Sequence, residues 1–342
     1  MAVAGNHIRV QSLARDGEMV VPRQYIQPPD TRPNQNHEKR TDEHLPTAPL
    51  IDFSDVSSFH EELGKACREW GAFQVINHGV PLELLDGMIR VGRSFFEDCT
   101  VDQKLSYACD PNSPASEGYG SRMLVSSNDT VLDWRDYFDH HTLPLSRRNP
   151  SNWPHFSSDY RKTVSDYSEQ IHFLAQKLLG LIAESLGLPS SSMKDGIGEF
   201  YQNITVSYYP PCPQPELTLG LQSHSDIGAI TLIIQDDVGG LEVLKNGEWI
   251  PINPLPHAIV VILADQTEII TNGEYNSAVH RAITNSKKAR LSVSSFHDPA
   301  KTKIIRPAFG PPKYHQVVYG DYYSSWYTKG PEGKRNIDTL KL

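Results

Sequence analysis

The chain has 342 residues and carries 41 acidic against 32 basic side chains, so its formal net charge is −9. This acidic balance argues against nucleic acid or an anionic membrane surface as the main partner. The longest apolar run, Ala258–Ala264, is too short to cross a bilayer. Four scattered cysteines without a CxxC pair, and an N-terminus without the features of a secretory signal, fit a reducing compartment. We therefore expect a cytoplasmic protein that binds no membrane and, lacking a coiled coil or broad apolar stripe, is a monomer.

Residues 1–47 are rich in proline, asparagine and charge, which is typical of an extended arm that lies on the body or moves freely. Alternation and helical spacing then predict four elements: a strand over 49–53, a helix over 59–70, a strand over 72–76 and a helix over 82–96. A longer helix follows from Tyr160 to Ile182.

The pattern changes after residue 200, where short apolar runs recur about every ten residues between turn signals such as Asn246-Gly247 and Asn272-Gly273. The predicted strands are 204–209, 217–224, 229–234, 241–244, 249–252, 259–263, 268–270, 277–283 and 290–296. Strands at this spacing indicate an antiparallel sandwich or barrel, with the preceding helices packed outside it.

Two histidines are followed two residues later by an acid, and chance alone gives about two such pairs in this composition. His60 and Glu62 fall in a predicted helix, where residues two apart point away from each other. His224 and Asp226 follow an extended run, where residues two apart share a face. Only the second pair is therefore arranged to hold one ion.

His280 lies in another predicted strand and is a candidate third ligand beside His224 and Asp226. Two imidazoles and one carboxylate on one side of a metal suit non-haem Fe(II) oxygen chemistry. Zinc takes the same donors, and a chance pairing of ordinary histidines is the other alternative.

Arg290 and Ser292 share one face of the last predicted strand, ten residues after His280. An inward arginine in an apolar barrel needs an anion, and its guanidinium matches a carboxylate through two hydrogen bonds. A structural ion pair is the alternative, but the nearby candidate ligand favours the carboxylate of a bound co-substrate.

Eight blocks in this order and spacing closely resemble the plant 2-oxoglutarate- and Fe(II)-dependent dioxygenases, the group of flavonol synthase and anthocyanidin synthase. They cover roughly residues 48–305, and their combination is specific although no single block is. The blocks are 66–80 (ACREWGAFQVINHGV), 117–120 (EGYG), 132–137 (LDWRDY), 208–213 (YYPPCP), 224–226 (HSD), 270–273 (ITNG), 280–281 (HR) and 290–292 (RLS).

The resemblance implies a mainly β fold with flanking helices: a distorted double-stranded β-helix, or jelly roll, with a long N-terminal extension of helices and strands. It divides the chain into the arm over 1–47, an N-terminal dioxygenase region over 48–155, the jelly-roll core with its supporting helix over 156–310 and a C-terminal lid segment over 311–342. The aromatic side chains of this last segment either cover the pocket mouth or form a packing patch.

The same resemblance makes His224, Asp226 and His280 the Fe(II) ligands that carry catalysis. Arg290 and Ser292 would bind the distal carboxylate of 2-oxoglutarate, with help from Tyr209. The implied reaction consumes O2, converts 2-oxoglutarate to succinate and CO2, and hydroxylates, desaturates or demethylates a small molecule of plant specialised or hormone metabolism. Ascorbate is the expected activator.

This chain departs from the family at the co-substrate end, where Ser207 replaces the usual asparagine. An amide contact to 2-oxoglutarate is therefore in doubt.

The family pattern places five residues near the substrate: Tyr137, Asp139, Thr205, Phe296 and Asp298. Relatives of the flavonoid type usually have an aromatic residue where Asp139 stands, and relatives that hold an acidic substrate often have a basic one where Thr205 stands. We therefore predict a neutral or basic substrate with an aromatic or polycyclic body stacked on Phe296.

Two other functions compete with this interpretation. One is a 2-oxoglutarate-independent Fe(II)/ascorbate oxidase of the same fold, which shares the iron ligands and an RxS pair. The other is a catalytically inactive relative that only binds a ligand, against which the intact ligand set argues.

Overall fold

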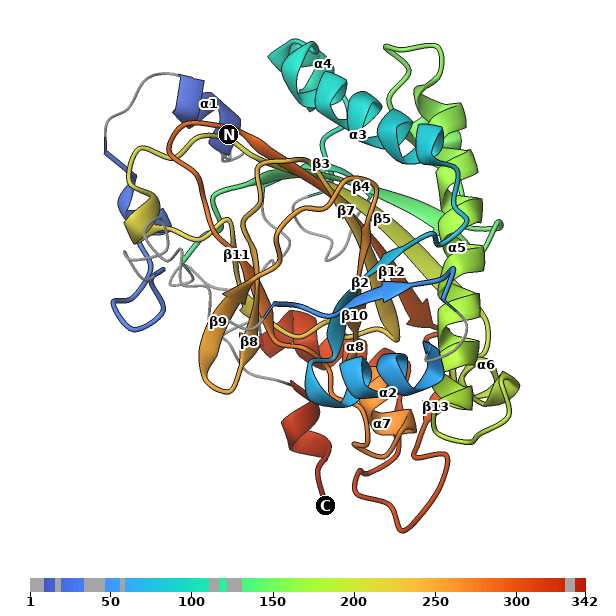
Figure 1. The fold of residues 1–342 in the computed structure, drawn as a ribbon. Helices are drawn as coiled ribbons and strands as arrows, with labels where there is room; N and C mark the ends of the chain where they lie inside the picture. Colours follow the sequence, from blue (N-terminus) through green and yellow to red (C-terminus); the bar gives the residue numbers. More distant parts are fainter. Residues whose placement is uncertain are drawn as a thin grey trace.

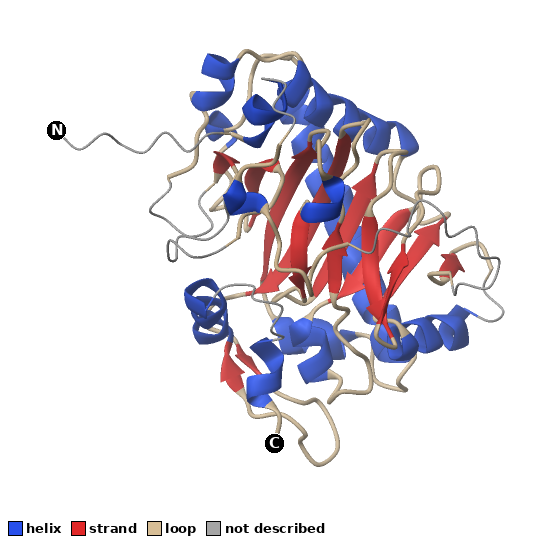
Figure 2. Ribbon diagram, turned by 90° about the vertical axis from the view of Figure 1, so that its left-hand side faces the viewer, coloured by secondary structure: helices blue, strands red, loops and turns tan. Residues whose placement is uncertain are grey.

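The computed structural model describes residues 9–15, 20–33, 47–55, 59–110, 117–121, 131–329 and 336–342. Within these residues, a sheet of eight strands in the order β1-β2-β10-β7-β12-β5-β4-β3 faces a sheet of four strands in the order β6-β11-β8-β9. Figure 1 shows α5 running along the large sheet on the side away from β8 and β9, and Figure 2 shows the strands side by side in the middle of the molecule.

The strands of the large sheet are β1 (Leu50–Asp52), β2 (Ala72–Ile76), β3 (Gly118–Gly120), β4 (Asp136–Leu143), β5 (Phe200–Tyr209), β7 (Ile230–Gln235), β10 (Ile259–Leu263) and β12 (Arg290–Pro299). Those of the small sheet are β6 (Leu221–His224), β8 (Leu241–Lys245), β9 (Glu248–Pro251) and β11 (His280–Ala282). A separate pair joins β13 (Ile304–Ile305) to β14 (Val317–Val318).

The α-helices are α1 (Val10–Arg15), α2 (Phe59–Glu69), α3 (Leu82–Glu97), α4 (Val101–Leu105), α5 (Tyr160–Glu184), α6 (Ser191–Ile197), α7 (Asp265–Ile270) and α8 (Tyr319–Lys329). Short 3-10 helices are η1 (Arg23–Tyr25), η3 (Pro150–Asn152), η4 (Pro215–Leu217) and η5 (Asn336–Leu340). In the described part of the chain no helix has both the length and the apolar character that a membrane span needs.

The helices cover the large sheet because one side of each is apolar. In α5 the buried positions recur every three or four residues, from Tyr160 through Val164 and Ile171 to Ile182. This side packs against α2, α3 and α6 and against strands β5, β7 and β12. Strand β10 is buried at all five positions because it lies inside the sheet with structure on both faces.

The opposite face of the large sheet and the small sheet enclose the cavity described below. The two sheets and their flanking helices form the double-stranded β-helix that the sequence predicts. Residues 225–229 connect β6 of the small sheet to β7 of the large sheet, and Asp226 lies in this connection.

The described parts of the N-terminal segment lie on the body and include a helix, α1, that the sequence analysis does not predict. The backbone N–H groups of Val10 and Gln11 each donate to a different carboxylate oxygen of the buried Asp136, both at 2.9 Å. Tyr25 packs edge-on against Trp134, with ring centroids 5.2 Å apart. These contacts tie the segment to the start of β4.

The predicted strand over 268–270 is wrong, because these residues form the end of helix α7. Asp265 and Glu268 occupy the first turn of α7, where acidic side chains favour a helix. The N–H of Asp265 also donates to the carbonyl of Asp226 at 2.8 Å, which starts the helix beside the loop after β6. The apolar pair at its end is buried, which a short run of sequence cannot distinguish from a strand.

Candidate metal and co-substrate site

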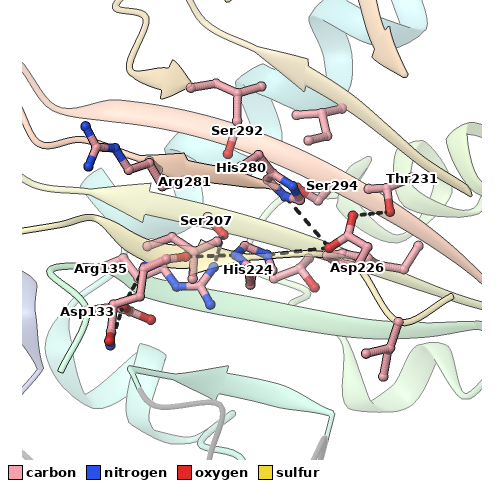
Figure 3. A pocket seen from close by; sticks show the side chains of 18 of the residues that line it. Asp133, Arg135, Ser207, His224, Asp226, Thr231, His280, Arg281, Ser292 and Ser294 are labelled. Carbon is pink, nitrogen blue, oxygen red and sulfur yellow. Dashed lines mark hydrogen bonds and ion pairs between the residues drawn. The ribbon is translucent and has the colours of Figure 1, made fainter. Parts of the chain in front are cut away.

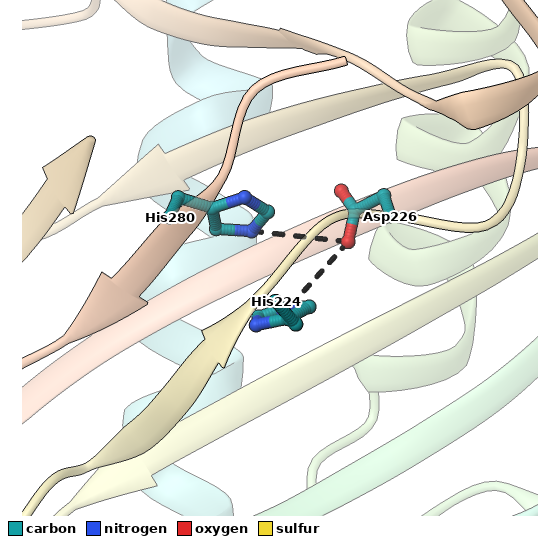
Figure 4. Close-up of side chains that lie close together, drawn as sticks. All are labelled: His224, Asp226 and His280. Carbon is teal, nitrogen blue, oxygen red and sulfur yellow. Dashed lines mark ion pairs between the residues drawn. The ribbon is translucent and has the colours of Figure 1, made fainter. Parts of the chain in front are cut away.

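His224, Asp226 and His280 come together at the edge where β6 and β11 pair. His224 ends β6, His280 begins β11, and the antiparallel register sets these two residues directly opposite each other. Asp226 follows in the loop after β6. One donor atom from each of the three lies within 4.8 Å of the others, and Figure 4 shows the side chains converging.

The two imidazoles present the same nitrogen to the carboxylate. Nε2 of His224 is 3.5 Å and Nε2 of His280 is 3.8 Å from Oδ1 of Asp226. The Nδ1–H of His224 donates to the carbonyl of Gln222 at 2.8 Å, and that of His280 donates to the carbonyl of Ala278 at 3.0 Å. These bonds fix the tautomer that leaves both Nε2 lone pairs facing Asp226.

The carboxylate of Asp226 is held from its other side, since Thr231 Oγ1 donates to Oδ2 at 2.6 Å. Burial alone would raise the pKa of Asp226, but the two histidines and Thr231 outweigh it and lower the pKa to about 2. Burial and the neighbouring His224 lower the pKa of His280 to about 4. At neutral pH the group therefore offers an ionised carboxylate and a neutral imidazole, as a metal requires.

This donor set fits an Fe(II) ion held on one face, with its remaining positions open to the cavity. All three residues line the cavity, so co-substrate and O2 can reach the metal from inside it.

The cavity floor is the inner face of β4, β5 and β12, and strand register puts its side chains in rows. Arg290 pairs with Tyr209, and two residues further along Ser292 pairs with Ser207. All four residues line the cavity. The predicted co-substrate residues therefore occupy two adjacent rows of one sheet.

The guanidinium of Arg290 is buried, and it donates to Gln235 Oε1 at 2.9 Å and to Ser292 Oγ at 3.4 Å. Its Nε is buried and has no hydrogen-bond partner among the described residues. Burial alone would raise the pKa of Tyr209, but the charges of Arg135 and Arg290, with Ser292 and Ser207, lower it. This end of the floor therefore favours negative charge and fits a bound carboxylate.

The next rows of the floor carry acids. Asp139 pairs with Thr205, whose Oγ1 donates to Asp139 Oδ1 at 2.7 Å, and both line the cavity. Phe296 and Asp298 follow on β12 and also line it. Burial raises the pKa of Asp139 and of Asp298 to about 7 in each case. Both carboxyls thus titrate near neutral pH.

Tyr137 pairs with Ser207 but is not among the residues that line the cavity, so its role in substrate binding stays a prediction. Its ring lies against Gly120 on the neighbouring strand β3, with its hydroxyl 3.9 Å from Cys109 Sγ. The guanidinium of Arg135 lies 5.6 Å from the ring centroid of Tyr137.

The sequence analysis missed Arg135, Thr231 and Gln235, which all contact predicted site residues. Thr231 and Gln235 are polar residues on one face of the otherwise apolar strand β7. Polar residues at such positions could have been recognised in the sequence as candidates for the site. Arg135 stands in the 132–137 block of the family resemblance, but the sequence indicates no partner residue from which its role could be predicted.

Comparisons with known proteins identify the family of this chain. Residues 200–299 match the model of the 2OG-Fe(II) oxygenase superfamily, and residues 48–156 match that of the non-haem dioxygenase in morphine synthesis N-terminal domain.

Similar proteins span most of the chain. Jasmonate-induced oxygenase 1 of Arabidopsis thaliana is 38% identical, covering 97% of this chain and 86% of the relative. Leucoanthocyanidin dioxygenase of Malus domestica is 36% identical, covering 87% and 86%. The crystal structure of JOX2 in complex with 2OG, Fe and JA superposes with a TM-score of 0.89 at 35% identity and covers 98% of both chains. The chain therefore belongs to the 2OG-Fe(II) oxygenase superfamily and is a 2-oxoglutarate-dependent dioxygenase.

Proposed function

We propose that His224, Asp226 and His280 hold Fe(II) in this enzyme, and that Arg290 and Ser292 bind the distal carboxylate of 2-oxoglutarate. Tyr209 and Ser207 complete the co-substrate subsite. The convergence of three buried donors, each fixed by a second hydrogen bond, carries the metal assignment. The buried guanidinium with an unused Nε supports the co-substrate assignment.

When bound, Fe(II) and 2-oxoglutarate would supply the electrons that reduce and so activate O2. The chain's own residues keep the metal's open positions facing the cavity and orient the co-substrate. The buried floor excludes water from the reacting atoms.

The first test is anaerobic addition of Fe(II) and then 2-oxoglutarate, followed by the weak visible charge-transfer band of the chelate. We expect the band in the wild type and its loss in His224→Ala, Asp226→Ala and His280→Ala, with the fold retained by circular dichroism. Arg290→Gln should need at least tenfold more 2-oxoglutarate. Turnover with ascorbate alone would instead favour the 2-oxoglutarate-independent oxidase.

The substrate we propose is a neutral or basic small molecule with an aromatic or polycyclic body. Asp139 and Asp298 also line the cavity, in rows of the floor that follow those of Arg290 and Ser292. Phe296 and two aromatic residues of α8, Tyr323 and Trp326, supply flat apolar surface there. A carboxyl with a pKa near 7 can donate a hydrogen bond to a neutral polar group or pair with an ammonium.

A carboxylic acid is the second candidate, because the similar JOX2 structure contains JA. Arg147 is a cation that acts on both acids, since its charge acts to lower the pKa of Asp139 and of Asp298, and Lys301 also acts on Asp298. Arg147 is already engaged, because its Nη1 donates to Asn203 Oδ1 at 2.7 Å.

A matched pair of substrates separates the two candidates. We would compare jasmonic acid with its methyl ester, and add flavonoid and alkaloid panels, measuring substrate-stimulated succinate and the oxidised product by mass spectrometry. Neutral or basic compounds should be turned over, and Asp139→Asn should lower turnover of basic ones most. Turnover confined to carboxylates would contradict the proposal.

Three expectations from the sequence remain predictions: a cytoplasmic location, a monomeric state and activation by ascorbate. Gel filtration with light scattering tests the second, and turnover with and without ascorbate tests the third.

A further inference from the structure

Arg135 is a buried cation on the cavity wall, in the position immediately before β4. Its side chain is 4% exposed and lines the cavity with Ser207 and His224. Its Nη1 donates to Ser207 Oγ at 3.1 Å. In Figure 3 its guanidinium points toward Ser207 and His224.

The surroundings of Arg135 hold the guanidinium in this direction. Asp133 also lines the cavity, and its Oδ1 accepts from the N–H of Gln222 at 3.0 Å, while the charge of Arg135 acts to lower its pKa. The ring centroid of Tyr137 lies 5.6 Å from Cζ of Arg135. The bond to Ser207 and these neighbours fix the place where the guanidinium meets the cavity.

Arg135 faces groups at both ends of the co-substrate subsite. At one end, Arg135 lines the cavity together with His224. On the other side, Arg135 and Arg290 both act on Tyr209, whose ring centroid is 5.0 Å from Arg290 Cζ. Arg135 thus faces the same cavity as the metal group and Tyr209, next to Ser207.

We propose that Arg135 is a second cation of the co-substrate subsite, facing the metal-chelating end of 2-oxoglutarate while Arg290 faces its distal carboxylate. This inference rests on the proposed placement of 2-oxoglutarate against Arg290. Two-point recognition suits a dianion, because each carboxylate then meets a buried guanidinium. Ser207, which stands where relatives usually have asparagine, accepts a bond from Arg135, so the arginine replaces the missing amide donor.

The test is anaerobic titration of the Fe(II)-loaded protein with 2-oxoglutarate, followed by the charge-transfer band and by calorimetry. Arg135→Gln should raise the dissociation constant at least tenfold, and Arg135→Lys should raise it less because the charge remains. Arg147→Gln is the matched control: it removes a cation at the substrate end and should titrate like the wild type.

Removal of Arg135 alone leaves Asp133 buried without its cation, which endangers the fold. The double variant Asp133→Asn/Arg135→Gln removes the pair as a unit, and it should show the same loss of affinity with a retained circular dichroism spectrum. Fe(II) binding without 2-oxoglutarate should be unchanged in both variants.

Three results are informative here. If the folded double variant binds 2-oxoglutarate within twofold of the wild type, the role of Arg135 is refuted while the proposed site stands. If Arg147→Gln weakens binding equally, the effect is one of general charge and the inference also fails. If the wild type itself develops no band, the proposed function fails first.

Discussion

The two carboxylate oxygens of Asp226 face different partners. Its Oδ1 faces the Nε2 atoms of His224 and His280, while its Oδ2 accepts from Thr231. A carboxylate fixed at one oxygen cannot rotate, so the other oxygen stays available in a single direction. Thr231 is therefore a positioning residue for the metal group.

Thr231→Val, which keeps the shape of the side chain but removes the hydroxyl, should weaken Fe(II) binding about 10- to 100-fold. The reason is that Asp226 loses the bond that orients it. Fe(II) affinity is measured anaerobically by competition with a chromophoric chelator. Thr231→Ser keeps the hydroxyl and should bind iron nearly as the wild type does. Equal affinity in the valine variant would show that the backbone alone orients Asp226.

Helix α8 carries both buried and cavity-lining aromatic residues. Tyr319 and Tyr322 are buried in the main core, and Tyr322 donates to Asp265 on α7. Tyr323 and Trp326 line the cavity. One side of the helix thus anchors it, and another presents aromatic surface to the substrate end.

Trp326→Ala should raise the KM for the substrate about tenfold, since a flat apolar contact worth roughly 1 to 2 kcal/mol is lost. Affinity for 2-oxoglutarate, measured by the charge-transfer band, should stay unchanged because the arginine end lies elsewhere. Ser324→Ala, an exposed position on the same helix, is the matched control. A loss of 2-oxoglutarate affinity in Trp326→Ala would contradict this division of the cavity.

Elements whose apolar positions repeat regularly could be predicted from the sequence, and irregular ones could not. Helices α2, α3 and α5 lie where the spacing puts them, within two residues. Strand β4 was not predicted because its Asp-Tyr-Phe-Asp-His-His run is polar, yet most of it is buried between β3 and β5. The sequence predicts a strand at the end of helix α7 because the apolar run there is too short to show a helical repeat.

The site divides in the same way. His224 and Asp226 could be paired from the sequence, and Arg290 with Ser292 likewise, because the members of each pair stand only two residues apart. Thr231 and Arg135 act across elements, and their partners appear only once β7 and β4 are in register with their neighbours. Local sequence carries no information on that register.

Where no opposite charge compensates for it, burial pushes acids and histidines towards their neutral forms. The pKa of Asp139 is raised to about 7, and that of His140 is lowered to about 4. His140 joins three elements: its Nδ1–H donates to the carbonyl of Ile204 on β5 at 2.8 Å, and its Nε2 accepts from Tyr160 on α5 at 3.0 Å. A protonated ring could no longer accept from Tyr160.

This linkage fixes the direction of the pH dependence. A histidine in the unfolded chain has a pKa near 6.5, whereas His140 in the folded chain has a pKa of about 4. Between these two pH values the unfolded chain therefore binds a proton that the folded chain does not bind. His140 therefore lowers the free energy of unfolding as pH falls from about 6.5 to 4. Buried Asp139 has the opposite effect, because its pKa is raised to about 7 in the folded chain. Its contribution to the free energy of unfolding is complete below about pH 4 and is lost as pH rises from about 4 to 7.

His140→Asn keeps a donor for Ile204 and removes the titrating ring, so it separates the two trends. At pH 7.5 the variant should be less stable than the wild type by about 1 to 3 kcal/mol, because Tyr160 loses its acceptor. That deficit should shrink by about 2 kcal/mol at pH 5, where the wild type has lost the contribution of its neutral histidine. Urea unfolding at both pH values measures the difference, with the exposed His60→Gln as the control. A deficit that stays constant would mean that His140 accepts a proton inside the fold.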